Sequence, residues 1–107
     1  PDAASVAKGR AGDREQGTEV AFAVRIERNR VAEARFRAFG CPHVLAAASW
    51  VAEAALGLDC DQLAAWDWQE AALVLEVPPA KFGRLLTLQD AIRAVVRNWP
   101  RTTGSTV

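Results

Sequence analysis

The fold is decided by residues 19–38, which read EVAFAVRIERNRVAEARFRA. Apolar residues recur at every second position from Val20 to Ile26, and the alternation resumes after Arg28-Asn29-Arg30. A period of two is typical of strands with one buried face, and Asn29 tolerates the positive φ of a tight turn. We therefore predict an antiparallel hairpin whose packed face carries Val20, Phe22, Val24 and Ile26, then Ala32, Ala34, Phe36 and Ala38.

The residues after this hairpin favour helices. Pro42 suits a first helical turn, and the helix from Val44 to Leu56 is predicted to end at Gly57. Two acidic capping boxes, Asp59 with Gln62 and Asp67 with Glu70, predict short helices over 60–66 and 68–76, although 73–77 also fits a strand. Prolines predict an extended segment over 77–81, and a last helix is predicted over 82–99.

A hairpin followed by helices predicts an α+β fold, a small antiparallel sheet with helices packed on one side. The chain has 107 residues, which fits one domain. We expect a flexible N-terminal segment over 1–18, a single domain over 19–99 and a C-terminal tail over 100–107. The sequence begins with Pro rather than Met, so we also expect a processed or trimmed start.

The composition excludes several classes of protein. Thirteen basic side chains balance thirteen acidic ones, which argues against nucleic-acid binding. No apolar run approaches the roughly 20 residues of a membrane span, and the first residues lack the apolar core of a signal peptide. Two cysteines do not make a disulfide scaffold, so a cytoplasmic protein is expected. Two Cys and one His also cannot fill a four-ligand zinc or cluster site alone.

Cys41 is the strongest candidate for chemistry. It lies where the second strand gives way to a helix N-terminus, and backbone N–H groups there favour a thiolate. The alternative is a buried thiol that packs as a small apolar side chain. Cys60, between Asp59 and Asp61, is expected to be structural because flanking carboxylates disfavour a thiolate.

Four blocks of the sequence resemble IscU/NifU-type iron–sulfur cluster assembly scaffolds. Residues 34–41, ARFRAFGC, resemble the family's A-R-F-K-T-F-G-C, and 46–49, AAAS, are similar to its A-I-A-S-S-S stretch. Residues 77–81, VPPAK, resemble its L-P-P-V-K segment, and 89–93, QDAIR, its E-D-A-I-K helix. The blocks keep the family's order and spacing and cover roughly residues 17–99, so the resemblance implies an IscU/NifU-like fold.

The resemblance also implies where ligands have been lost. Only Cys41 remains of the family's three cluster cysteines. The family's C-G-D turn falls on Gln16-Gly17-Thr18, or in a shifted alignment on Ala11-Gly12-Asp13, and its His-Cys pair falls on Gly83-Arg84. We therefore interpret Gln16, Thr18, Gly83 and Arg84 as vestigial ligand positions.

Carry-over from the family assigns roles to the residues that remain. Cys41 is the expected sulfur acceptor and metal ligand. His43 is either a replacement ligand or a loop residue bonded to backbone, and Asp13, Glu15 or Gln16 are possible oxygen ligands. Arg84 either opposes Fe²⁺ or Zn²⁺ and stabilises the Cys41 thiolate, or is simply a surface residue at a helix start. The chaperone-like segment, Val77, Pro78, Pro79, Ala80 and Lys81, either binds a partner or simply connects two helices.

The expected function is that of a scaffold-like protein, not an enzyme. Cys41 works with unusual ligands, or in a dimer, or the domain is degenerate and acts through protein contacts, which we favour. The cofactor is an iron–sulfur cluster, iron or zinc, or none. Expected partners are a cysteine desulfurase, an Hsp70-type chaperone and cluster acceptors. The alternative is a reactive thiol in sulfur transfer or redox sensing. The charged face of the hairpin, with Arg25, Arg35 and Arg37, is either solvated or a partner patch.

Overall fold

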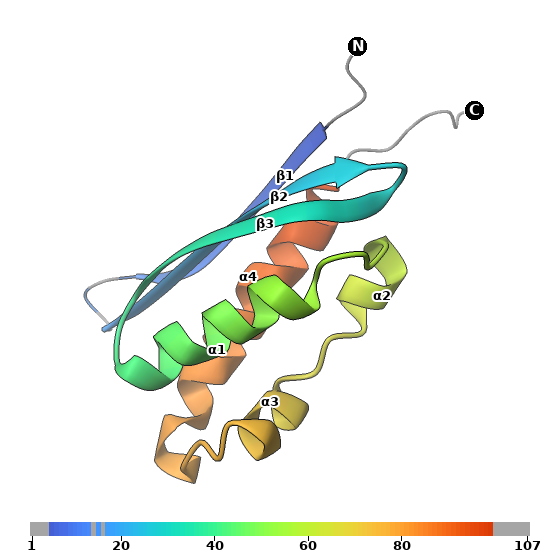
Figure 1. The fold of residues 1–107 in the computed structure, drawn as a ribbon. Coiled ribbons are helices and arrows are strands. Elements are labelled where there is room, and N and C mark those ends of the chain that lie inside the picture. The colour runs from blue at the N-terminus through green and yellow to red at the C-terminus, as the bar shows by residue number, and fades with distance from the viewer. Residues whose placement is uncertain (1–4, 14, 16, 100–107) are drawn as a thin grey trace.

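The computed structural model describes residues 5–13, 15 and 17–99. Within these residues the chain forms one antiparallel sheet with the strand order β1-β2-β3: β1 (Ser5–Asp13), β2 (Thr18–Glu27) and β3 (Arg30–Phe39). Two long helices, α1 (Pro42–Ala54) and α4 (Phe82–Arg97), lie against one face of this sheet (Figure 1). The predicted α+β fold, with helices packed on one side of a small sheet, is confirmed.

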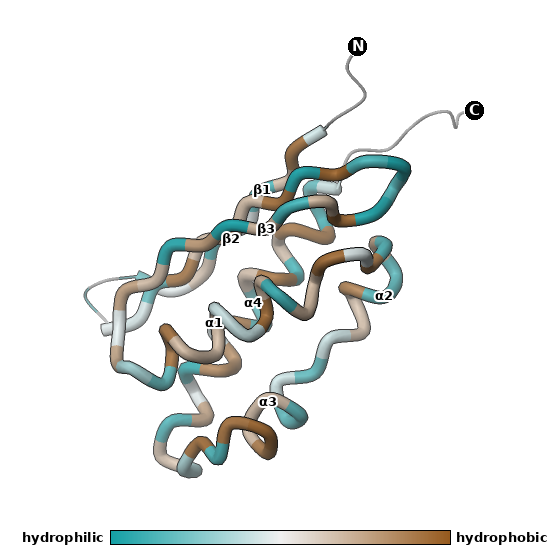
Figure 2. The backbone as a smooth tube through the Cα atoms, viewed as in Figure 1, coloured by the Kyte–Doolittle hydropathy of each residue, from teal (hydrophilic) through white to brown (hydrophobic). Residues whose placement is uncertain are grey.

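The β2–β3 hairpin forms as the alternation predicts. Arg28 and Asn29 make the turn, both with positive φ, at 55° and 64°. Every second residue of β2 is buried. Figure 2 shows that the sheet carries both hydrophobic and hydrophilic segments. The prediction for Ala32 is wrong, because a register shift pairs Ile26 with Val31 and leaves Ala32 exposed. Such a bulge moves the inward position by one residue, and Val31 takes it.

The prediction of a flexible segment over residues 1–18 is wrong for Ser5–Asp13, which form β1. This strand pairs with β2 along its whole length. Its buried residues, Ala7 and Gly9, are small, so the strand lacks the large apolar side chains that would have marked it. They are small because α4 lies directly beneath: a Cβ added to Gly9 would lie 2.5 Å from the backbone oxygen of Ala91. The side chain of Asn98 also donates to the Lys8 carbonyl, at 2.7 Å.

Two short helices, α2 (Cys60–Ala64) and α3 (Trp68–Val74), connect the long ones. The capping box predicted at Asp59 is present: its carboxylate accepts from the Gln62 N–H at 2.8 Å, and the Gln62 side chain accepts from the Asp59 N–H at 3.0 Å. Asp67 also caps its helix, but it accepts from the Gln69 N–H. The alternative of a strand over 73–77 is excluded, because α3 continues to Val74.

The prediction of an extended segment over 77–81 is only partly right. Pro78 is extended, with φ −66° and ψ 149°, but Pro79–Lys81 form a 3₁₀ turn, η2, that leads into α4. Proline disfavours the α region in the residue before it, whereas its own φ suits a first helical turn. Pro79 therefore ends the extended segment and starts the helical one.

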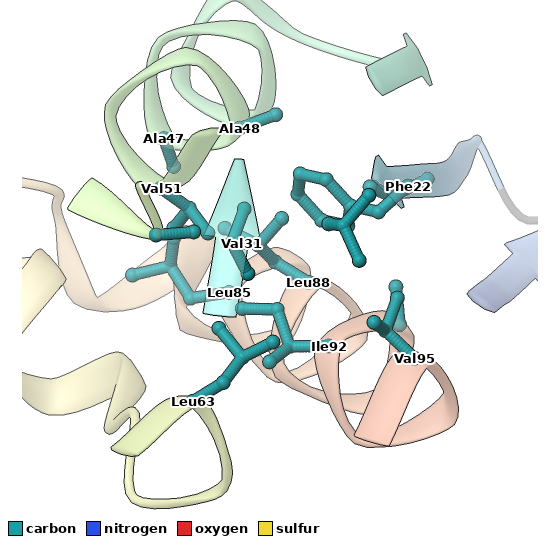
Figure 3. Close-up of a cluster of buried hydrophobic side chains, with 14 of the residues drawn as sticks. Phe22, Val31, Ala47, Ala48, Val51, Leu63, Leu85, Leu88, Ile92 and Val95 are labelled. Atoms are coloured by element: carbon teal, nitrogen blue, oxygen red, sulfur yellow. The ribbon is translucent and has the colours of Figure 1, made fainter. Parts of the chain in front are cut away.

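One apolar core joins the sheet to the helices. Figure 3 shows part of this cluster, in which Phe22 and Val31 of the sheet are drawn together with Leu85, Leu88 and Ile92 of α4 and with side chains of α1 and α2. Leu85 and Leu88 are completely buried. Among the described residues, no helix is long and apolar enough to cross a membrane.

Candidate functional site

The candidate site lies where β3 leads into α1. A Cβ added to Gly40 would lie 3.2 Å from the backbone oxygen of Gly17, so the end of the β1–β2 connection lies against this junction. A Cβ added to Gly12 would lie 2.9 Å from the Thr87 side chain of α4. Three segments that are distant in sequence therefore meet near Cys41: the β1–β2 end of the sheet, the start of α1 and the start of α4.

Cys41 is the N-cap residue of α1, as predicted. Its backbone is extended, with φ −78° and ψ 167°, and Pro42 follows in the first turn. The Cys41 carbonyl accepts from the N–H groups of Val44 at 3.0 Å and Leu45 at 3.3 Å. The thiol is therefore held at a helix N-terminus by backbone geometry, and it is half-buried there.

Opposing influences act on the Cys41 thiol. Burial is the largest single one and raises its pKa. The backbone N–H groups of Val44 and His43 lower it, as do the charges of Arg84 and Lys81. Together these outweigh burial, so the pKa of Cys41 lies below its ordinary value. The anion is the nucleophilic and metal-binding form of cysteine, and this environment favours it.

Arg84 is the most informative neighbour of Cys41. The residue is half-buried, and its Nε has no access to water and no hydrogen-bond partner among the described residues. Buried donors in native proteins are nearly always paired, so an unpaired one calls for a ligand or an unusual role. An unpaired N–H on a cation favours an anionic acceptor.

Of the other candidate site residues, those that the structure describes have different surroundings. Gln16 lies outside the described residues. Thr18 is buried opposite Asp13 in the sheet, whereas Gly83 is exposed and its carbonyl accepts from the Thr87 hydroxyl at 3.3 Å. His43 acts on the thiol through its backbone N–H.

The described residues do not form a metal cage. Among residues 5–13, 15 and 17–99, no group of three or more His, Cys, Asp or Glu side chains is placed to hold a metal ion. Arg84 also adds a positive charge that would repel Fe²⁺ or Zn²⁺. A three- or four-ligand iron or zinc site therefore does not fit the donors that these described residues supply.

The chaperone-like segment forms an exposed turn beside the site. Val77 is buried and its N–H donates to the Ala72 carbonyl at 3.0 Å, while Pro78, Pro79 and Ala80 are exposed. Lys81 closes the turn, since its N–H donates to the Pro78 carbonyl at 2.8 Å. The turn thus ends in a residue whose charge acts on Cys41.

Cys60 belongs to a different helix from Cys41. It is the first residue of α2, is half-buried and packs against the apolar core. This placement is consistent with the structural role expected for it.

Sequence reasoning missed two parts of the site. Lys81 was assigned to the connecting segment and not to the thiol, although its spacing of three from Arg84 corresponds to about one helical turn. The resemblance places Gln16-Gly17-Thr18 and Cys41 at ligand positions of one site, but the specific contact between Gly17 and Gly40 was missed, because two isolated glycines do not indicate that their backbones meet.

Comparison with known proteins gives consistent matches. A family model described as "NifU-like N terminal domain" matches residues 2–106. The chain is 30% identical over 83 residues to the iron-sulfur cluster assembly protein IscU of Plasmodium falciparum, covering 78% of this chain and 51% of that protein. It is 32% identical over 69 residues to the scaffold protein IscU of Escherichia coli K12, and this match covers 64% of this chain and 54% of that protein. It is 26% identical over 101 residues to the scaffold protein IscU of Haemophilus influenzae, and this match covers 94% of this chain and 80% of that protein. The chain spans about half the length of the first two relatives.

Proposed function

Because the chain belongs to the family of NifU-like N-terminal domains, we propose that it is a scaffold-like protein of iron–sulfur cluster assembly that acts through protein contacts. Two of its relatives carry the name of IscU assembly scaffolds. In this proposal the domain is not an enzyme. It presents a single thiol, Cys41, inside a framework that partners recognise.

One observation carries the proposal: three distant segments converge on Cys41, but the described residues there supply no metal cage. A chain that had simply lost the function would have little reason to keep a thiol whose pKa is lowered in part by the charge of Arg84, a residue whose Nε has no hydrogen-bond partner among the described residues. The framework and the thiol therefore support a retained role in sulfur handling and docking rather than cluster storage by one chain.

Sulfur acceptance is the chemistry that Cys41 suits best. Its thiolate would attack the outer sulfur of a persulfide on a cysteine desulfurase. The donor S–S bond breaks, a new S–S bond forms on Cys41, and the donor cysteine leaves as a thiolate, so no external oxidant or reductant is needed. Arg84 and Lys81 would stabilise the anionic product. Iron, zinc or a cluster would bind only if further ligands came from His43, a second copy or a partner.

The proposed partners follow the same geometry. A cysteine desulfurase and cluster acceptors would approach the end of the molecule that carries Cys41. An Hsp70-type chaperone would bind the exposed Pro78-Pro79-Ala80 turn, which lies beside that end.

Anaerobic reconstitution with ferrous iron and sulfide tests the proposal. We expect less than one [2Fe–2S] cluster per chain by visible absorption and iron content, and we expect Cys41→Ser to abolish what does form. Cys60→Ser is the matched control and should retain it. A stoichiometric cluster on the monomer that survives Cys41→Ser would overturn the proposal, as would the absence of saturable binding to a purified cysteine desulfurase.

A second candidate function rests on the lowered pKa of Cys41 alone: a reactive thiol in redox sensing, independent of cluster assembly. Incubation with a loaded cysteine desulfurase separates the two. A mass increase of one sulfur atom that requires Cys41 supports the scaffold-like role. No sulfur transfer, together with rapid oxidation of Cys41 by dilute peroxide, supports the redox role instead.

A further inference from the structure

The outer face of the sheet, away from the helices, carries a trough with basic sides. Cross-strand pairing places Lys8, Ala23 and Arg35 in one row and Arg10, Ala21 and Arg37 in the next. The alanines of β2 form the floor, and the four basic side chains stand on β1 and β3. We call this surface the basic trough; it is defined by Lys8, Arg10, Ala21, Ala23, Arg35 and Arg37.

The trough is a real hollow. Together with Gly9, Phe22, Phe36 and Asn98, these residues line an open surface depression of about 690 Å³. The floor is low because Ala21 and Ala23 have only methyl side chains. The two walls stand two strand spacings apart, about 10 Å, which is also the usual distance between packed sheets. An extended segment of chain therefore fits between them.

Most of the positive charge of the trough can bind the carboxylates of a partner. Lys8 and Arg37 are exposed and form no ion pair with any of the described residues. Arg10 pairs with Glu19 at 3.0 Å, and Arg35 pairs with Glu33 at 2.8 Å. Both of these arginines are mostly exposed, and exposed ion pairs are weak, so a partner's carboxylates would compete for them.

The neutral total charge of the chain hides this surface. Residues 5–39, which include the sheet, have eight basic and five acidic side chains, whereas residues 40–99, which include the helices, have four and seven. The sheet half is therefore positive and the helical half negative. A mainly basic surface with a hollow centre favours a ligand of the opposite charge, although Glu19 and Glu33 also lie on this face.

We propose that the basic trough docks an extended acidic segment of a partner protein, with carboxylates at alternate positions. Side chains two residues apart on one face of an extended chain repeat about every 6.8 Å. Lys8 and Arg10, like Arg35 and Arg37, have this same repeat because they too are two residues apart on strands. Arginine binds carboxylates in a two-pronged geometry, which adds specificity to the charge.

A second copy of the chain is a poorer occupant. Its negative surface is on the helical half, so the contact would be head-to-tail and would lack the self-complementary pairing of the commonest two-fold dimers. A nucleic acid fits less well too, because Glu19 and Glu33 lie close to the basic walls and interrupt a continuous positive path.

Fluorescence anisotropy with the whole chain tests the proposal. The probe is a dye-labelled peptide of roughly eight residues in which Glu alternates with Thr, matched by a peptide with Gln for Glu. Binding should be saturable for the Glu peptide alone and should weaken with added salt. The double variant K8E/R37E removes no recorded ion pair and should weaken binding by about tenfold or more.

Two further variants decide the interpretation. Arg93→Glu reverses one charge on the exposed surface of α4, half the charge change of the double variant, and should weaken binding by about twofold or less. Ala23→Trp fills the floor without changing charge and should weaken binding by about fivefold or more. Circular dichroism melts confirm that each variant folds.

The proposal is overturned if the Gln peptide binds equally well, if Arg93→Glu weakens binding as much as the double variant, or if Ala23→Trp has no effect. Tighter binding of duplex DNA than of the Glu peptide would assign the trough to nucleic acid. A K8E/R37E-sensitive increase in mass by light scattering would assign it to self-association.

Discussion

The thiol of Cys41 shows how much of a residue's chemistry comes from distant parts of the chain. Its position at a helix N-terminus follows from its own neighbours, Gly40 and Pro42. The charges that lower its pKa come from Lys81 and Arg84, some forty residues later. Local sequence predicts the favourable dipole and the family resemblance predicts the charge of Arg84, whereas the contribution of Lys81 emerges only from the fold.

Arg84→Gln should raise the pKa of Cys41, because it removes one of the charges that favour the thiolate. Iodoacetamide alkylation followed against pH, in a Cys60→Ser background, should show the midpoint moving to higher pH and the rate at neutral pH falling. Arg93→Gln on the same helix is the control. An unchanged midpoint would mean that Arg84 does not act on the thiol.

Two glycines make a matched pair for stability. A Cβ at Gly9 would meet the backbone of α4, so Gly9→Ala should destabilise the fold by about 2 kcal/mol or more. Gly83 has no atom within 4 Å of an added Cβ and lies in a helix, so Gly83→Ala should stabilise by about 0.5–1 kcal/mol. Urea denaturation measures both. A neutral Gly9→Ala would show that β1 does not lie this close to α4.

Elements with strong periodic patterns were predictable, and those shaped by close packing were not. The hairpin and α4 were anticipated because large apolar residues recur at periods of two and about four. β1 was missed because contact with α4 selects Ala7 and Gly9, which carry little apolar signal, although Lys8 and Arg10 already alternate with them. The turn η2 was missed because two consecutive prolines were taken to extend the whole segment.

The exposed turn before α4 has its own test. Replacing Pro79 and Ala80 with Asp adds charge to an exposed surface without touching the buried Val77. If this turn binds an Hsp70-type chaperone, the double variant should reduce affinity by about tenfold in an anisotropy titration. The same two-Asp change at exposed Ala64 and Ala65 is the control. Equal effects of both variants would exclude a specific docking turn.

The candidate site was only partly predictable, because some of its contacts depend on tertiary packing rather than on local sequence. The likeness of the sequence to a known scaffold family marked Cys41, Gly83 and Arg84, and the fold brings the Arg84 charge to the thiol. The approach of Gly17 to Gly40 depends on how the end of the sheet folds onto α1. Such a contact belongs to the tertiary structure, and no local pattern encodes it.

At the scale of the whole molecule, one shared core holds the sheet to the helices. Leu88 is completely buried and lies within that core, whereas Leu73 on α3 is 81% exposed. Stability therefore depends on α4 far more than on α3, whose hydrophobic stretch is visible in Figure 2.

Leu88→Ala should lower the free energy of unfolding by about 2–5 kcal/mol, because it leaves a cavity between sheet and helix. Leu73→Ala should change it by about 0.5 kcal/mol or less. Chemical denaturation with intrinsic tryptophan fluorescence measures both. Comparable losses in the two variants would contradict the single-core arrangement.

The separation of charge between the sheet and the helices has a consequence for motion in solution. It makes this neutral molecule an electric dipole whose positive pole is the sheet. An approaching acidic protein would rotate the domain before contact, so that the sheet meets it first. The association rate, rather than the lifetime of the complex, should then respond most strongly to ionic strength.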